Sequence, residues 1–218
     1  MTYGIILAAG IGERFKKTPI KPLFLIKGKP LFLYTVDTFL DSQRIDKILL
    51  VINQKFKKQF QGYLASPKYR SILICDGDQR ARWKSLIKAM DYLSSHCVLK
   101  PNDIIVSHDA ARINLTTKII NDNILVTNKY GYASTVLPLH DSIMEFKDQA
   151  LYLERTHKYI VQTPQTFQYK FWKKHQIKVE TDVTDLFTYL KLKINQSNLV
   201  TGNLLNFKIT TIEDLQLI

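Results

Sequence analysis

The chain has 218 residues, of which 45% are hydrophobic and 23% are charged, and its formal net charge is +12. This size and composition indicate a soluble globular protein with a sizeable core, and no apolar run is long enough to span a bilayer. The first apolar segment is too short for a signal peptide, so we expect a cytoplasmic protein that does not bind membranes.

The excess of positive charge raises the question of a nucleic-acid partner. The lysines are spread along the chain, however, with only short clusters at residues 55–58 and 170–174. Because no helix-turn-helix, zinc-finger or RNA-binding signature accompanies them, we expect small phosphorylated ligands and no nucleic acid. The two cysteines, Cys75 and Cys97, lack C-x-x-C spacing and are expected in the core or at its edge.

Segments typical of strands and helices alternate along the chain. Apolar, β-branched runs predict strands at residues 4–9, 47–52, 71–75, 103–107 and 133–137. Apolar residues at helical spacing predict helices at residues 30–40, 55–64, 80–93, 116–128, 182–192 and 211–217. This order predicts an α/β fold with a mainly parallel sheet, flanked by helices and built with right-handed crossovers.

The pattern changes at residues 141–157, where polar and apolar residues mix without a helical period. These residues are expected to form an extended arm that leaves the sheet. Since no repeat, low-complexity tract or linker interrupts the sequence, we expect one domain, residues 1–218, that carries the arm at residues 141–157.

A glycine-containing basic loop follows the first predicted strand, in the stretch GIILAAGIGERFKKTPIKPL that begins at residue 4. Gly10 and Gly12 allow backbone amides to approach an anion closely, and Arg14 and Lys21 add positive charge. At the end of a parallel strand, such a loop favours a phosphate-containing ligand over an ordinary basic turn. The dinucleotide-binding motif needs a glycine where Phe15 stands, and no stretch has the P-loop spacing.

A second candidate site lies in the stretch VSHDAAR, where His108 and Asp109 end a predicted strand. A carboxylate in this position can hold a hard divalent cation or cap the following helix, and the stretch alone does not separate the two. The other histidines show no zinc-type spacing from His108. Lys208, in the stretch GNLLNFKITTIEDL, is by itself an ordinary lysine.

Taken together, the motifs are far more specific than any one of them. In one order along the chain stand LAAGIGER, KPL, GDQR, HDAAR, QTPQTF, TD and NFKITTIEDL. In that order the sequence resembles the cytidylyltransferases that join CMP to a phosphorylated polyol, either methylerythritol 4-phosphate or ribitol 5-phosphate. The resemblance implies a Rossmann-like nucleotidyltransferase fold, CTP as a substrate, Mg2+ as cofactor and release of pyrophosphate. It implies a place in isoprenoid biosynthesis or in cell-wall or capsule polyol biosynthesis.

The resemblance also implies a role for each matched residue. Arg14 would clamp the triphosphate, and Lys21 and Lys208 would balance charge at the α-phosphate, which makes these three the expected catalytic set. Asp109 would support Mg2+ and contact both nucleotide and substrate. The backbone groups expected to line the nucleotide belong to Ala8, Ala9, Gly10 and Gly12.

One segment departs from the family pattern. Gly77 and Arg80 match the family's G-G-x-x-R segment, which holds the cytosine and the ribose, but Asp76 replaces the first glycine. Trp83 stands where a serine is usual, three residues after the arginine, and the nearest serine is Ser85. We favour a place for Trp83 in the helix core over stacking on a ligand.

In the family, the arm crosses to a second subunit and completes the partner's site. Ser142 and Arg155 match the hydroxyl group and the arginine that contact the substrate phosphate there, which implies a homodimer. LAAG and HDAAR are similar to the methylerythritol group, whereas KIINDNI, QTPQTF and KITTIEDL are more similar to the ribitol group, which we favour slightly.

Two other functions stay open at this point. The KPL element is similar to that of the wider sugar nucleotidyltransferases, which leaves another activated sugar or alcohol as the product. A non-catalytic nucleotide-binding protein is disfavoured because the charged residues of the expected site are all retained.

Overall fold

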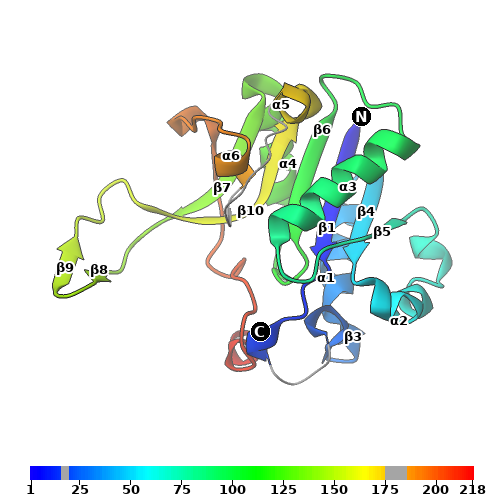
Figure 1. Cartoon of the computed structure of the whole chain (residues 1–218), viewed down its shortest axis with the longest axis horizontal. Coiled ribbons are helices and arrows are strands. Elements are labelled where there is room, and N and C mark those ends of the chain that lie inside the picture. Colours follow the sequence, from blue (N-terminus) through cyan, green and yellow to red (C-terminus); the bar gives the residue numbers. More distant parts are fainter. Residues whose placement is uncertain (16–19, 175–185) are drawn as a thin grey trace.

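The structure is a computed structural model that describes residues 1–15, 20–174 and 186–218 (Figure 1). Within these residues, a seven-stranded sheet has the strand order β11-β7-β10-β6-β1-β4-β5. Its strands are β1 (Thr2–Ala8), β4 (Lys47–Ile52), β5 (Leu73–Asp76), β6 (Ile104–Asp109), β7 (Tyr132–Pro138), β10 (Tyr159–Gln168) and β11 (Leu199–Thr201). Strands β5, β4, β1 and β6 are parallel, β10 is antiparallel to β6 and β7, and β11 is parallel to β7. The predicted mainly parallel α/β fold is confirmed.

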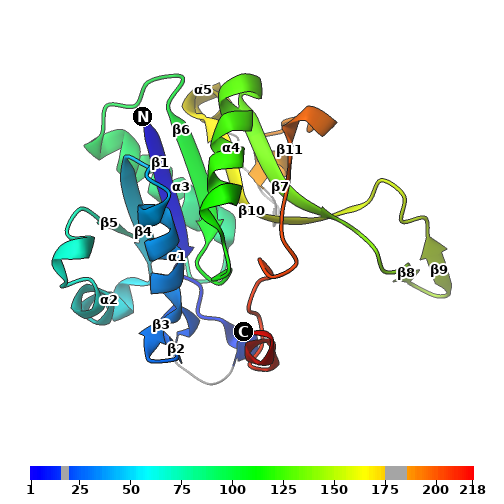
Figure 2. The ribbon, with the colours of Figure 1, turned by 180° about the vertical axis from the view of Figure 1, so that it is seen from behind.

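Helices cover both faces of the sheet, as Figures 1 and 2 show from opposite sides. The helices are α1 (Leu31–Asp41), α2 (Lys57–Tyr63), α3 (Arg82–His96), α4 (Thr117–Tyr130), α5 (Tyr169–Lys174) and α6 (Leu186–Tyr189). Helices α1, α2 and α4 pack on one face, and α3, α5 and α6 pack on the other. Successive residues of β1 serve opposite faces, with Ile6 in the first cluster and Ile5 in the second. Burial on both faces explains why the strands are continuous apolar runs.

Some predicted elements differ from the structure. A 3-10 turn, Gln54–Phe56, precedes α2, and the C-terminal segment forms a 3-10 helix, Glu213–Leu217, in place of the expected α-helix. Of the helix expected at residues 182–192, the structure shows α6, while residues 182–185 lie outside the described residues. The hairpin of β2 (Leu25–Ile26) and β3 (Lys29–Pro30) was not predicted, because two-residue strands are too short for an alternating pattern.

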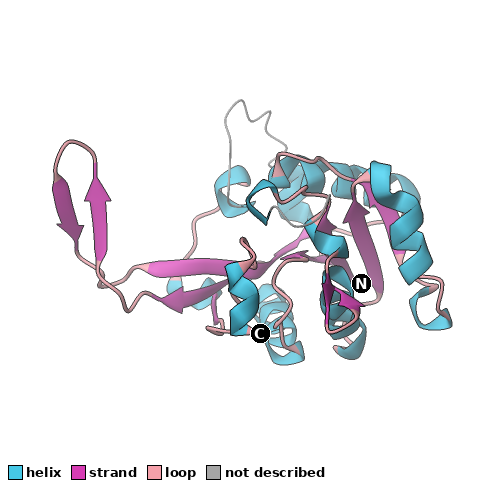
Figure 3. Ribbon diagram, turned by 90° about the horizontal axis from the view of Figure 1, so that it is seen from below, coloured by secondary structure: helices cyan, strands magenta, loops and turns pink. Residues whose placement is uncertain are grey.

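Residues 141–157 stand away from the sheet (Figures 1 and 3). Strands β7 and β10 lead out to a short two-stranded hairpin, β8 (Ile143–Phe146) and β9 (Ala150–Leu153). Its apolar side chains are largely in solvent, since Phe146 is 70% exposed and Tyr152 is 75% exposed. A single chain therefore presents an apolar hairpin with nothing to cover it among the residues described.

In the described part of the chain, no helix combines the length and the hydrophobicity needed to cross a membrane.

His108 is fully buried in β6 and makes two hydrogen bonds within the core. Its Nδ1 lies 2.9 Å from Thr163 Oγ1, and its Nε2 lies 3.2 Å from the carbonyl oxygen of Arg112. Because a carbonyl oxygen can only accept, Nε2 carries the proton and Nδ1 accepts from the Thr163 hydroxyl group. Burial lowers the pKa of His108 from 6.5 to about 4.

Acidification is expected to destabilise the fold through His108. The unfolded chain binds this proton first, so stability is lost as the pH falls from 6.5 toward about 4. A shift of this size changes the free energy of unfolding by at most about 3 kcal/mol. Chemical denaturation between about pH 7 and pH 4.5 measures the slope, which should be shallower in His108→Gln because glutamine does not titrate. Equal slopes in the two proteins would contradict this role.

Candidate active site

A cavity of about 570 Å3 opens at the carboxyl ends of the parallel strands. Its walls are the loop after β1, the segment between β5 and α3, the end of β6 and the segment after β11. The residues predicted for the site that line it are Ala8, Ala9, Gly10, Gly12, Arg14, Lys21, Arg80, Asp109 and Lys208. Figures 1 and 2 show how the chain brings the N-terminal loop and the C-terminal segment side by side. This edge is where open α/β sheets bind their ligands.

The loop after β1 is a tight turn built on Gly12. Its φ angle of 71° lies in the left-handed region, and its carbonyl accepts a hydrogen bond of 2.8 Å from the Phe15 amide. A side chain at Gly12 would also meet Lys21, since a Cβ there would lie 2.9 Å from the Lys21 Cβ. Phe15 is buried against Phe24, with ring centroids 5.1 Å apart, and so anchors the loop. The loop is thus held close to Lys21 with its backbone facing the cavity.

Asp109 holds two cations at the end of β6. Its Oδ1 lies 2.6 Å from Arg82 Nε, and its Oδ2 lies 2.9 Å from Lys208 Nζ. Burial alone would raise the pKa of Asp109, but the charges of Arg82, Lys208 and Arg112 outweigh it and hold this pKa well below its usual range. Asp109 is therefore a permanent carboxylate that positions two cationic groups in the cavity wall. The alternative prediction, a helix cap, is not what its side chain does here.

Lys21 is buried, although the basic stretch around it suggests an exposed loop. Its Nζ donates a hydrogen bond of 2.6 Å to the carbonyl oxygen of Ile209, next to Lys208 in the chain. Burial, with the nearby charge of Lys208, lowers the pKa of Lys21 from 10.5 to about 8. Arg14, by contrast, is exposed. Lys21 thus has a structural contact as well as a position in the cavity.

Arg14→Ala and Lys21→Ala are expected to separate these two roles. Each should lower turnover by about 100-fold, the scale for losing one preorganised charge-stabilising donor. Only Lys21→Ala should also lower the melting temperature, because Ile209 loses its buried hydrogen-bond donor. Steady-state kinetics and thermal melting on both variants measure this. Turnover near the wild-type value in either variant would disprove its catalytic role.

Arg82 is a site residue that the sequence prediction missed. It pairs with Asp109 and lines the cavity, while Arg80, the predicted residue, is exposed at the rim. Arg82 Nη2 is buried and has no hydrogen-bond partner among the described residues. Ser85 follows Arg82 by three residues and also lines the cavity. The expected arginine–serine spacing is therefore present, shifted two residues along the chain from the predicted arginine.

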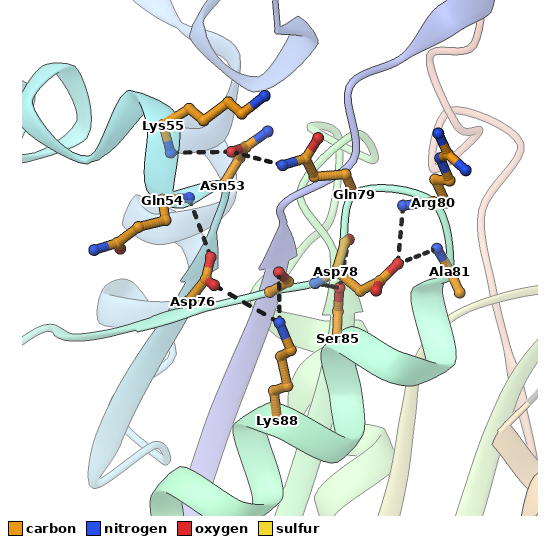
Figure 4. A network of polar contacts seen from close by, with 11 residues as sticks. Asn53, Gln54, Lys55, Asp76, Asp78, Gln79, Arg80, Ala81, Ser85 and Lys88 are labelled. Atoms are coloured by element: carbon orange, nitrogen blue, oxygen red, sulfur yellow. Dashed lines mark hydrogen bonds and ion pairs between the residues drawn. The ribbon is translucent and has the colours of Figure 1, made fainter.

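The other residues of this segment have structural roles. Ser85 Oγ both accepts from the Asp78 amide and donates to the Asp78 carbonyl, each at 2.9 Å, and so closes the loop before α3 (Figure 4). Gly77 does not line the cavity; it packs on Ala9, whose Cβ would be only 2.4 Å from a Cβ at Gly77. Trp83 is partly buried: its ring stacks on Tyr189 with centroids 6.2 Å apart and packs against the second core cluster, in agreement with the favoured core position.

Ser142 and Arg155 are not brought to the cavity by this chain. Both are exposed on the arm, and Arg155 donates a hydrogen bond to the carbonyl of His140 at the base of the arm. The predicted substrate contacts therefore cannot be made within one chain as it stands.

The fold and the site together define an α/β enzyme of the nucleotidyltransferase class, with a glycine loop and converging cations at the ends of parallel strands. Within that class, the residue pattern matches one family along its whole length. The chain belongs to the 2-C-methyl-D-erythritol 4-phosphate cytidylyltransferase family, whose model matches residues 2–218.

Its relatives carry two different substrate names. A 2-C-methyl-D-erythritol 4-phosphate cytidylyltransferase of Thermosipho melanesiensis is 32% identical, covering 100% of this chain and 96% of that protein. A ribitol-5-phosphate cytidylyltransferase of Lactiplantibacillus plantarum is 30% identical, covering 99% of this chain and 96% of that protein. The solved 4-diphosphocytidyl-2C-methyl-D-erythritol synthase of Anaerococcus prevotii superposes with a TM-score of 0.78 at 26% identity, covering 100% and 93% of the two chains.

Proposed function

We propose that the protein transfers CMP from CTP to the phosphate of a polyol phosphate, releasing pyrophosphate and a CDP-polyol. One observation carries the proposal: Arg14, Lys21 and Lys208, from opposite ends of the sequence, line one cavity. Preorganised cations are what a reaction between two phosphates requires, because negative charge accumulates between the reacting groups. Membership of the family supports cytidylyl transfer as the reaction.

The reaction is a displacement between two anions. An oxygen of the substrate phosphate attacks the α-phosphorus of CTP and forms a new phosphoanhydride bond. The bond from the α-phosphorus to its bridging oxygen breaks, and pyrophosphate leaves with that electron pair. The attacking phosphate is already ionised near neutral pH, so positioning and charge neutralisation suffice and no protein base is needed.

The cationic residues would act on different phosphates. Arg14, exposed on the loop after β1, would hold the leaving phosphates. Lys21 is held by the Ile209 carbonyl and Lys208 by Asp109, and the two lysines would flank the α-phosphate. Arg82, which pairs with Asp109, adds a further cation on the same wall. We expect cations on both sides of the reacting phosphorus to stabilise the transition state more than either bound anion.

We also propose Mg2+ as cofactor. Mg2+ binds through one or two protein carboxylates together with phosphate and water oxygens, so a single aspartate beside a triphosphate is a suitable site. The two oxygens of Asp109 now contact Arg82 and Lys208. Asp109 would bind Mg2+ by giving up one of these two contacts to the ion. When bound, Mg2+ would neutralise part of the triphosphate charge.

The proposed assembly is a homodimer with shared sites. The apolar residues of the hairpin are exposed in a single chain, and a large exposed apolar patch marks an interaction surface. Docking of the arm on a symmetric partner would bury them and would bring Ser142 and Arg155 to the partner's cavity.

We further propose that the enzyme works in the cytoplasm, where CTP is available.

Substrate choice is the finer part of the proposal. The two named relatives differ in substrate and are almost equally similar to this chain, at 32% and 30% identity. We propose ribitol 5-phosphate ahead of methylerythritol 4-phosphate, on the motifs at residues 118–124, 162–167 and 208–215.

A pyrophosphate-release assay tests both levels of the proposal. Each nucleoside triphosphate is offered with ribitol 5-phosphate, methylerythritol 4-phosphate and other polyol phosphates, and Mg2+ is included or removed with chelator. Release that needs CTP, one polyol phosphate and Mg2+ is expected. Another nucleotide or a sugar phosphate as the best pair would replace this function by the related nucleotidyltransferase alternative.

A further inference from the structure

The cavity extends from one side of β1 to the other. Asp109 ends β6, on one side of β1, whereas the loop at residues 77–81 follows β5, on the other side of β1 beyond β4. Gln79, in that loop, lines the cavity and contacts Asn53 at the end of β4. A nucleotide whose phosphates meet Lys21 and Lys208 would therefore extend its base toward Gln79.

The amide group of Gln79 has a defined orientation (Figure 4). The backbone amide of Lys55 donates to Asn53 Oδ1 at 3.1 Å, and since an amide nitrogen of the backbone can only donate, the oxygen of Asn53 is identified. Gln79 Nε2 lies 3.4 Å from the same oxygen and donates to it. Asn53 is 1% exposed, so it cannot turn freely. The carbonyl oxygen of Gln79, Oε1, is consequently left free to accept from a ligand.

The backbone that carries Gln79 is also fixed. The Asp78 carboxylate accepts from the amides of Arg80 and Ala81, at 3.0 and 2.7 Å. On the other side of the loop, Lys88 Nζ donates to the Gly77 carbonyl at 3.2 Å. Figure 4 shows these contacts bracketing Gln79 between β5 and α3. A side chain held at its backbone and at one end of its amide can present a specific hydrogen-bonding group.

We propose that Gln79 Oε1 selects cytosine over uracil by accepting a hydrogen bond from the 4-amino group of the base, an inference that rests on the proposed function. Cytosine presents an amino donor at this position, whereas uracil presents a carbonyl acceptor. Two acceptors facing each other repel, and turning the Gln79 amide to fit uracil would break its hydrogen bond to Asn53 and place its oxygen against Asn53 Oδ1. A site built to accept from one group discriminates strongly against an analogue that lacks the donor.

Gln79→Met tests the proposal, because methionine has a similar length and no polar group. Binding of CTP and of UTP is measured by calorimetry without polyol phosphate, so that no chemistry is needed. The wild-type protein should bind CTP more tightly than UTP. In the variant, the ratio of the two affinities should fall about tenfold, because CTP binds more weakly. Gln54→Met is the matched control: Gln54 is exposed on the far side of Asn53 and should keep the wild-type ratio.

The outcomes distinguish the role of Gln79 from the proposed function. An unchanged preference in Gln79→Met, in a protein that melts like the wild type, would overturn the role of Gln79 alone. A wild-type protein that binds CTP and UTP equally would do the same. A wild-type protein that binds neither nucleotide would overturn the proposed function, and the role of Gln79 with it.

Discussion

Asp109→Asn is expected to lower the rate of CMP transfer by about 1,000-fold, the upper scale for loss of one preorganised electrostatic group. The carboxylate is ionised throughout the neutral range, because the charges of Arg82 and Lys208 hold its pKa low. Asparagine has the same shape but cannot neutralise either cation, and it would be a weak ligand for Mg2+. Both the position of Lys208 and the proposed metal contact are lost in one substitution.

The same substitution should also destabilise the fold, because the buried Asp109 carboxylate is lost and Arg82 and Lys208 are left without their anionic partner. Kinetics must therefore be measured on protein shown to be folded, at a temperature well below its melting point. Asp122→Asn is the matched control, because Asp122 pairs with Lys118 on the surface of α4, away from the cavity. Wild-type turnover in folded Asp109→Asn would remove Asp109 from the mechanism.

Mixing two inactive variants should restore activity, if the sites are shared between subunits. Arg155→Ala removes the proposed contact from the arm, and Lys208→Ala removes a cation from the cavity. Each protein alone is expected to retain about 1% of wild-type activity or less. In a mixed dimer, one cavity receives Lys208 from its own chain and Arg155 from the other, so one of its two sites is complete.

Random exchange of subunits at equal concentrations makes half of the dimers mixed, so the mixture should recover about one quarter of wild-type activity. Subunit exchange is verified by mass spectrometry of differently tagged chains. As a control, a double variant that carries both substitutions is mixed with the wild type. Subunits then exchange in the same way, but neither site of a mixed dimer is complete. No recovery despite proven exchange, or a fully active monomer by sedimentation, would rule out shared sites.

The sequence predicted the sheet well because the relevant signals are local. Buried parallel strands are continuous apolar runs, and β4 was predicted with the bounds that the structure shows, Lys47–Ile52. The antiparallel strand β10 was harder to foresee. Its inner half carries polar side chains, such as Gln162, Thr163 and Gln165, which are buried in the structure. Their burial depends on partners distant in the sequence, so no periodic pattern indicates it.

The site was predicted in its chemistry but only partly in its geometry. Lys21 is in a basic stretch that suggests an exposed loop, yet its partner, Ile209, is 188 residues away in the chain. Arg82 was missed because the loop before α3 differs in length from the family pattern, which drew attention to Arg80. The serine at position 85 was the available signal, since it follows Arg82 by the expected three residues. The start of this loop is held by the close packing of Gly77 on Ala9, which the sequence does not display.

Phosphorus-31 NMR of the complete reaction tests cytidylyl transfer most directly. The purified protein is incubated with CTP, Mg2+ and ribitol 5-phosphate or methylerythritol 4-phosphate, and every phosphorus-containing product is resolved. The expected result is equal amounts of pyrophosphate and a CDP-polyol, formed with one of the two polyol phosphates and lost in Asp109→Asn. Breakdown of CTP that does not depend on any polyol phosphate, or no consumption of CTP by the folded protein, would contradict the proposed reaction.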